Sequence, residues 1–202
     1  MILIDSREKP KAITKIIKCF EENNVDYDTS KLYVGDYQSL DNPKVIVDRK
    51  QNLAEIMQNV TQKRFRDELI RAKKAGIYLI ILIEHSKDIT CIDDITKWKN
   101  PRLEYWKFKA RKQLSQDLGG WFAFCKEKIN KDDEWELYKN LKGRNLKVTR
   151  PPQSPEQLRK ALHTIEDNKE DYDVSFKFCS KSETGQKILE FLSQKWYNLI
   201  RW

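Results

Sequence analysis

Residues 34–50 read VGDYQSLDNPKVIVDRK, a segment that joins a Gly-Asp pair, a turn signal and an acid-Arg-Lys triplet. The turn signal is Asp-Asn-Pro at 41–43, so a bent strand or hairpin is expected on one side of it and a strand on the other. Residues two apart in a strand face the same side, which makes Asp48 and Lys50 point together while Arg49 points away. The segment therefore predicts an acid and an amine on one face of a sheet.

The neighbouring segments alternate strands with helices. Residues 77–83 form a continuous apolar run bounded by Gly76 and Glu84, as in a central strand covered on both faces. Periodicity predicts a strand at 2–4 that ends at Asp5, further strands at 25–28 and 31–34, and helices at 11–23, 53–60 and 65–75. Alternation of this kind implies an α/β fold with a mixed central sheet flanked by helices.

Composition indicates an anionic partner. The 202 residues carry a formal net charge of +8 with a sequence pI near 9.2, and nucleic acid is the commonest partner of so basic a chain. A Lys-rich protein without such a partner is the alternative. We expect a soluble, cytoplasmic protein, because neither a signal peptide nor a membrane span of about 20 apolar residues is present. Four scattered cysteines argue against a zinc site or a disulfide framework.

Composition also divides the chain into three predicted parts. Residues 1–95 form the α/β core, 96–150 a Trp/Lys-rich helical insertion, and 151–202 a C-terminal helix-strand-helix segment that packs on the core. Seven cations crowd residues 97–112, where only Glu104 opposes them and four aromatics lie among them. We expect these cations to contact DNA: Lys97, Lys99, Arg102, Lys107, Lys109, Arg111 and Lys112. We expect Leu103 and Trp106 to pack in a core instead.

We expect a catalytic site where the ends of several strands meet. Asp5, Glu8, Asp36, Asp48 and Lys50 would converge if their strands are neighbours in the sheet. Carboxylates packed together repel one another unless a hard cation lies between them, and Mg²⁺ or Mn²⁺ suits an all-oxygen site. Such a site equips a protein for phosphodiester hydrolysis. Each residue also has an ordinary alternative role, as a helix cap, a turn residue or a surface charge.

The ordered set of motifs resembles the nuclease domain of the XPF family, structure-specific DNA endonucleases of the restriction-endonuclease-like superfamily. The similarity lies in IDSRE at 4–8, VGDY at 34–37, VDRK at 47–50, Arg64-Phe65 and the strand at 78–84, and it spans roughly residues 1–86. It implies a restriction-endonuclease-like mixed sheet and DNA as the partner. The C-terminal segment resembles small stand-alone members from phages and their bacterial hosts, which implies roles in DNA repair or recombination.

The resemblance also implies roles for single residues. Asp36 and Asp48, with Glu8, would bind the metal, Lys50 would be the catalytic lysine, and Asp5 would complete the acidic pocket. Arg7, Arg49 and Arg64 would contact DNA. Two departures stand out: Asp48 replaces the usual Glu, and Ala54 stands where the family has Asp, with Glu55 one residue later as a substitute.

The function expected from these observations is a Mg²⁺- or Mn²⁺-dependent DNA endonuclease, with branched or flap DNA as candidate substrates. The tandem helix-hairpin-helix module, through which large family members grip branched DNA and dimerise, has no counterpart here, so that preference does not transfer directly and a homodimer stays an open alternative. Two other functions were weighed: a non-catalytic DNA-binding scaffold on the same fold, and a protein–protein module with an incidental basic surface.

Overall fold

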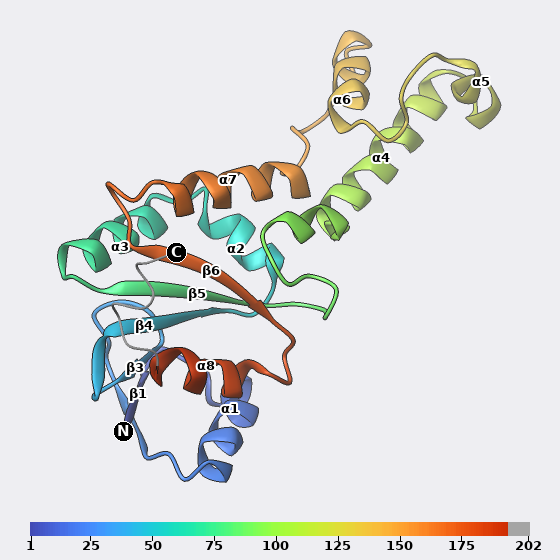
Figure 1. The fold of residues 1–202 in the computed structure, drawn as a ribbon. Helices are drawn as coiled ribbons and strands as arrows, with labels where there is room; N and C mark the ends of the chain where they lie inside the picture. Colours follow the sequence, from blue (N-terminus) through green and yellow to red (C-terminus); the bar gives the residue numbers. More distant parts are fainter. Residues whose placement is uncertain (194–202) are drawn as a thin grey trace. The chain divides into compact units, whose positions relative to one another are not determined.

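The structure, a computed structural model, describes residues 1–193 and centres on a six-stranded mixed sheet (Figure 1). Its strand order is β2-β1-β3-β4-β5-β6. The strands are β1 (Ile2–Asp5), β2 (Tyr27–Ser30), β3 (Tyr37–Ser39), β4 (Asn42–Lys50), β5 (Tyr78–Glu84) and β6 (Val174–Cys179). β3 runs antiparallel to both of its neighbours, and the remaining pairs are parallel. The expected mixed α/β sheet flanked by helices is confirmed.

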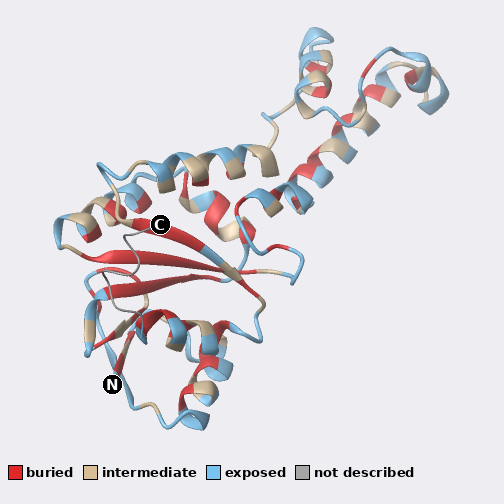
Figure 2. Cartoon of the chain, viewed as in Figure 1, coloured by how far each residue is buried: buried red, intermediate tan, exposed pale blue. Residues whose placement is uncertain are grey.

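Helices cover both faces of this sheet (Figure 1). α1 (Pro10–Glu22) and α8 (Thr184–Ser193) pack together on one face, while α2 (Leu53–Asn59) and α3 (Lys63–Lys74) lie on the other, together with α7 (Pro155–Asp167). Every residue of β5 is buried as a result, and Figure 2 shows the central strands red along their length. The apolar run at 77–83 was the sequence signal for this covered strand.

The described chain divides into two compact units. Residues 1–95 and the segment from Arg159 onward form the first, which we call the sheet unit, and residues 96–158 form the second, the helical unit. The sequence placed the second boundary at 150/151, whereas the structure places it at 158/159. β6 pairs in parallel with β5, so the C-terminal segment supplies the last strand of the sheet. Residues 194–202 of that segment lie outside the described residues.

The helical unit has a core of its own. It consists of α4 (Pro101–Asp117), α5 (Trp121–Lys126) and α6 (Glu134–Gly143), which follow the short 3₁₀ helix η1 (Asp93–Lys97). The buried core residues of this unit are Trp106, Ala110, Leu114, Phe124, Ile129, Leu137 and Leu141. The predicted burial of Leu103 and Trp106 is confirmed, and the Trp106 indole N–H donates to the Thr149 carbonyl at 3.1 Å. Among residues 1–193, none of the helices is long and apolar enough to cross a bilayer.

Two sequence predictions differ from the observed elements. β2 begins at Tyr27, two residues later than predicted, because it is an exposed edge strand whose side chains leave no apolar pattern. The bent strand or hairpin predicted over residues 31–40 forms only in its second half, as β3. Residues 31–34 form an irregular bend, in which Leu32 and Val34 are buried without strand pairing. The bend leads directly into Gly35.

Gly35 is required by its backbone and by its neighbours. Its φ of +65° lies in the left-handed region that favours glycine. A Cβ atom placed on Gly35 would lie 2.5 Å from Ile46 Cγ2 and 3.2 Å from the Val47 carbonyl oxygen. Gly35 therefore allows the chain to turn directly against β4.

Gly35→Ala should destabilise the protein by on the order of 2–4 kcal/mol, because left-handed strain adds to overlap with Ile46. Gly76→Ala is the matched control: it has the same φ of +65°, but no atom lies within 4 Å of the added Cβ, so only about 1 kcal/mol is expected. Urea unfolding of both variants measures the difference. Equal losses would contradict the close packing of Gly35 on β4.

Candidate active site

Asp48 and Lys50 lie on the sheet face covered by α2 and α3. Both are in β4, two residues apart, so the pleat directs them to the same side. Lys50 Nζ donates to Asp48 Oδ1 at 2.8 Å and lies 2.7 Å from Oδ2. The two side chains are only 10% and 4% exposed. The predicted acid and amine on one face are thus held as a buried ion pair.

Asp36 is brought to this pair by the turn at Gly35. The Asp36 amide donates to the Val47 carbonyl at 2.9 Å, and its Oδ2 accepts the Arg49 amide N–H at 2.8 Å. Burial, together with the nearby Asp48 carboxylate, raises the pKa of Asp36 well above its ordinary value. Backbone contacts therefore fix Asp36, in the turn before β3, next to Asp48 of β4.

Lys50 remains a cation in this setting. Burial alone would lower the pKa of its amine, but the negative charges of Asp48 and Asp36 outweigh burial and raise the pKa above its ordinary value. A lysine of this kind donates hydrogen bonds at neutral pH and does not accept protons.

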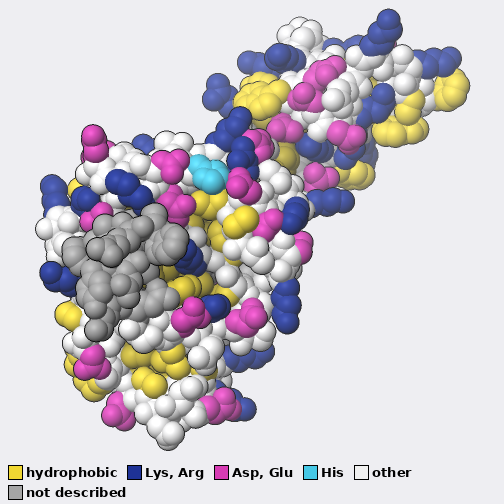
Figure 3. Space-filling model, viewed as in Figure 1, with side chains coloured by type: hydrophobic (Ala, Val, Ile, Leu, Met, Phe, Trp, Pro, Cys, Tyr) yellow, Lys and Arg dark blue, Asp and Glu magenta, His cyan; other side chains and the backbone are white. Residues whose placement is uncertain are grey.

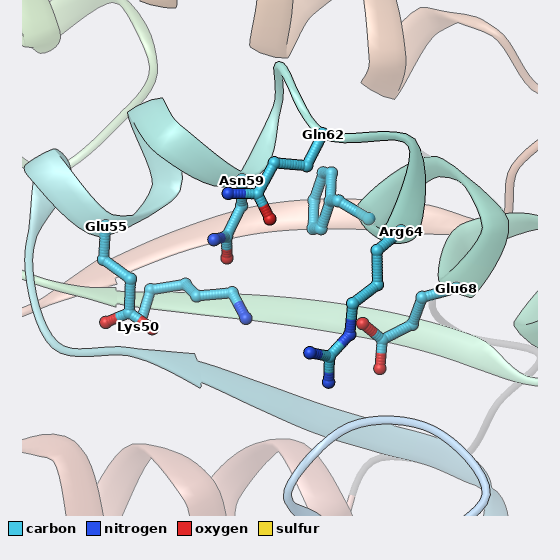
Figure 4. A pocket seen from close by; sticks show the side chains of 7 residues that line it. Lys50, Glu55, Asn59, Gln62, Arg64 and Glu68 are labelled. Atoms are coloured by element: carbon cyan, nitrogen blue, oxygen red, sulfur yellow. The ribbon is translucent and has the colours of Figure 1, made fainter.

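A cavity of about 210 Å³ opens beside the Lys50 side chain, between β4, α2 and α3. Figure 4 shows Lys50 extending into it, with Glu55 and Asn59 from α2 and with Arg64 and Glu68 from α3 around it. Glu68 also accepts the Gly35 amide N–H at 3.2 Å, so α3 stabilises the turn that carries Asp36. Glu55 accepts the Gln51 amide at 2.8 Å and thus has a capping role beside the cavity.

Asp36 and Asp48 fit a divalent cation by their chemistry. Asp48 Oδ2 is a buried oxygen that lacks an aligned hydrogen-bond donor among the described residues, and the adjacent Asp36 raises the repulsion that a cation would relieve. Within residues 1–193, no three acidic, His or Cys side chains gather closely enough to form a complete metal site by themselves. The protein contributes two converging carboxylates, and the remaining ligands of a hard cation are commonly waters and substrate phosphate.

The structure brings Glu8 near the acids but binds it to Arg49. Glu8 Oε2 accepts from Arg49 Nη1 at 3.3 Å. Burial raises the pKa of Glu8, Arg49 opposes that change, and Glu55, Asp48 and Glu84 add to it. Glu8 is therefore electrostatically linked to the acid pair without lying in direct contact with it.

Asp5 positions the surrounding loops. Its side chain is fully buried, Oδ1 accepts from the Arg7 amide and Nε, and Oδ2 accepts from Arg7 Nη2 and from the Leu32 amide. Burial would raise the pKa of Asp5, but these hydrogen bonds and the Arg7 charge lower it. Both oxygens are thus engaged, and Asp5 holds the bend before Gly35 instead of facing the acid pair.

Arg49 lies on the opposite sheet face from Asp48 and Lys50, as the pleat predicts. Its side chain is 1% exposed, and Nε donates to Glu84 Oε1 at 2.7 Å. Glu84 also accepts the Thr184 hydroxyl at 2.9 Å, which joins β5 to α8. The expectation that Arg49 contacts DNA does not fit this placement, because the guanidinium is buried among protein partners.

The other predicted DNA contacts lie at the surface to different degrees. Arg64 is exposed at the cavity, and Arg7 is half exposed while paired with Asp5. In the helical unit, Lys107 is largely buried against Glu134 and Arg111 pairs with Asp132. The remaining predicted cations of that unit are exposed: Lys97, Lys99, Arg102, Lys109 and Lys112.

Sequence reasoning missed several residues around the site. Asn59, Gln62 and Glu68 line the cavity, but they lie in α2, in the turn before α3 and in α3, where only the apolar positions were predicted to matter. Glu68 lies one helical turn after Arg64, a spacing that places both on one face of α3 and that was available in the sequence. Glu84, at the end of β5, was treated only as a boundary of the apolar run.

Comparison with known proteins gives a family match. The model of the family described as ERCC4 domain matches residues 4–191. Among solved structures, XPF from *Aeropyrum pernix* matches with a TM-score of 0.44 and 14% identity over 95% of this chain, and the same protein in complex with DNA matches with 0.45 and 13% over 95%. This chain spans 64% and 62% of those two chains. No curated protein matches it in sequence.

Two substitutions should change stability with opposite dependence on pH. The raised pKa of Asp36 means that ionisation above its ordinary value of 3.8 disfavours the fold, a penalty that is absent below that pH and grows as pH rises toward the folded pKa. Asp36→Asn removes the penalty, so in EDTA the variant should gain stability over the wild type between pH 4 and 8. Thermal unfolding is the measurement, and about 1 kcal/mol shifts Tm by roughly 2–4 °C in a chain of this size.

Asp5→Asn is the control, because its effect on stability should depend on pH in the opposite direction. The lowered pKa of Asp5 contributes stability that is present above 3.8 and is lost as pH falls through the folded pKa. This variant should unfold at lower temperature near neutral pH and approach the wild type in acid. Parallel pH profiles for the two variants would contradict the electrostatics described here.

Proposed function

The chain belongs to the ERCC4 domain family, as its resemblance to XPF-family nucleases predicted, and we propose that it is a divalent-metal-dependent endonuclease that hydrolyses phosphodiester bonds in DNA. One observation carries the proposal: Asp36, from the turn before β3, lies beside Asp48 and Lys50 of β4. The cavity beside Lys50 supplies room for a phosphate group.

Asp36 and Asp48 would hold the cation, Mg²⁺ or Mn²⁺. They are fixed by the Val47 carbonyl and the Arg49 amide on one side and by Lys50 on the other, so little rearrangement is needed. Glu8 would act from a greater distance, through charge. When bound, such an ion lowers the pKa of a coordinated water and offsets charge on a phosphoryl oxygen.

Lys50 would stabilise the negative charge that develops on the phosphate. Asp48 and Asp36 raise the pKa of Lys50, so the protonated amine would act as a hydrogen-bond donor to a phosphate oxygen. Asp48 orients the amine through the 2.8 Å hydrogen bond. Removal of either partner therefore leaves the other misplaced.

Two arginines would bind the DNA backbone next to the reacting phosphate. Arg64 is exposed at the cavity, where its planar guanidinium suits a phosphate. Arg7 is 52% exposed, and its charge interacts with Glu68 and Asp36 near the cavity. A homodimer, a preference for branched or flap DNA, a cytoplasmic location and a role in repair or recombination stay predictions from the sequence.

The proposed function predicts Mg²⁺-dependent cleavage of supercoiled plasmid DNA that EDTA abolishes. Asp48→Asn and Lys50→Met should each slow cleavage by about 100-fold or more, because charge stabilisation at the phosphate is lost. Asp41→Asn and Lys18→Ala are matched controls, because these side chains are 86% and 74% exposed and form ion pairs with the Met1 amine and with Glu22 instead of with the acid pair. Cleavage that persists in EDTA, or in both site variants, would refute the proposal.

A further inference from the structure

The helical unit exposes aromatic side chains that its own core does not use. Phe108 is 58% exposed and Trp121 is 57% exposed, whereas the core of the unit is complete without them. Tyr105 and Phe122 are also exposed, with Lys109 and Lys126 each 4.5 Å from the centre of one of these rings. A group of exposed aromatic side chains of this kind indicates an interaction surface.

Phe108 and Trp121 line one hollow. It has a volume of about 410 Å³, and Arg111, Lys112 and Ser115 of α4 complete its walls. Trp121 packs against the buried Phe124, with ring centres 5.3 Å apart, so the fold supports this exposed ring from behind. The hollow therefore combines two flat apolar rings with two cations.

Charge indicates the kind of occupant. Residues 96–158 contain almost twice as many Lys and Arg as Asp and Glu, and so carry most of the chain's net charge of +8. Figure 3 shows hydrophobic side chains exposed among dark blue basic ones on this unit. Within residues 1–193 the ion pair of Arg111 is with Asp132, which is 88% exposed, and so exposed a pair is weak enough for a phosphate to replace.

We propose that the hollow lined by Phe108, Arg111, Lys112 and Trp121 binds unpaired nucleotides of DNA, with bases stacked on the rings and phosphates on the cations. The bases of duplex DNA already stack on one another and do not present their faces, whereas those of a single strand do. This inference rests on the proposed nuclease function and deepens it, because it assigns to the helical unit a binding site for the unpaired part of a DNA substrate.

The test uses the full chain carrying Asp48→Asn, in EDTA, so that binding is measured without cleavage. Fluorescence anisotropy with a labelled oligo(dT) of about 15 nucleotides and with a duplex of the same length gives both affinities. We expect tighter binding of oligo(dT). Phe108→Ala or Trp121→Ala should weaken it by about tenfold, while Trp121→Phe, which keeps a ring, should retain most of the affinity.

Phe122→Ala is the matched control, because Phe122 lies next to Trp121 and is 76% exposed but does not line the hollow. Lys112→Gln should lower the slope of log Kd against log salt by about 0.7, as expected for one phosphate contact on a single strand. Circular dichroism checks that each variant keeps its helices.

Three outcomes would overturn the inference: equal affinity for oligo(dT) and duplex, unchanged oligo(dT) binding by the Phe108 and Trp121 variants, or a loss in Phe122→Ala as large as in Trp121→Ala. A change of mass in light scattering of the Phe108 and Trp121 variants, without a change in DNA affinity, would assign the hollow to a second copy of the chain and would also overturn it. If the wild type cleaves DNA but the Phe108 and Trp121 variants bind oligo(dT) normally, this inference is wrong and the proposed function stands. If binding depends on these rings but the wild type does not cleave DNA, only the proposed function is wrong.

Discussion

Two carboxylates held side by side, Asp36 and Asp48, are the constraint on which the site depends. Acids this close repel one another when both are ionised, and the amine of Lys50 supplies a compensating positive charge beside them. The rest of the sheet unit maintains this arrangement. Gly35 permits the turn, the Arg49 amide fixes the Asp36 carboxylate, and the buried β5 holds β4 in place. Backbone geometry and apolar packing thus hold the two carboxylates together despite their mutual repulsion.

The pleat of β4 places the candidate catalytic residues on one face of the sheet and a buried stabilising ion-pair network on the other. Asp48 and Lys50 face α2 and α3, while Arg49 between them faces α1 and α8. On that side Arg49 joins Glu8 and Glu84 in a buried network, which ties β4 to β5 and to the start of α1. A buried ion pair of this kind is strongly destabilised when one partner is removed. One triplet therefore serves two faces, and Arg49 contacts the acid pair through its backbone N–H, which donates to Asp36 Oδ2.

Features that follow from sequence periodicity were predicted correctly, whereas features that depend on tertiary contacts were not. The period of two placed Asp48 and Lys50 together and Arg49 apart, and the continuous apolar run at 77–83 revealed the covered strand. The role of Asp5 was beyond reach, because its carboxylate is engaged by Leu32, a residue whose approach depends on an irregular bend. α5 was also missed, since a helix of six residues leaves no periodic signal. Arg49 was predicted to contact DNA, although the pleat had already directed it away from Lys50.

Calorimetric titration with Mn²⁺ tests the central claim most directly, because it measures cation binding without DNA or turnover. The wild-type protein should bind the ion, Asp36→Asn and Asp48→Asn should each lose that binding, and Glu8→Gln should keep most of it because Glu8 is paired with Arg49. Wild-type protein that shows no binding, or acid-pair variants that bind as tightly as the wild type, would contradict the account.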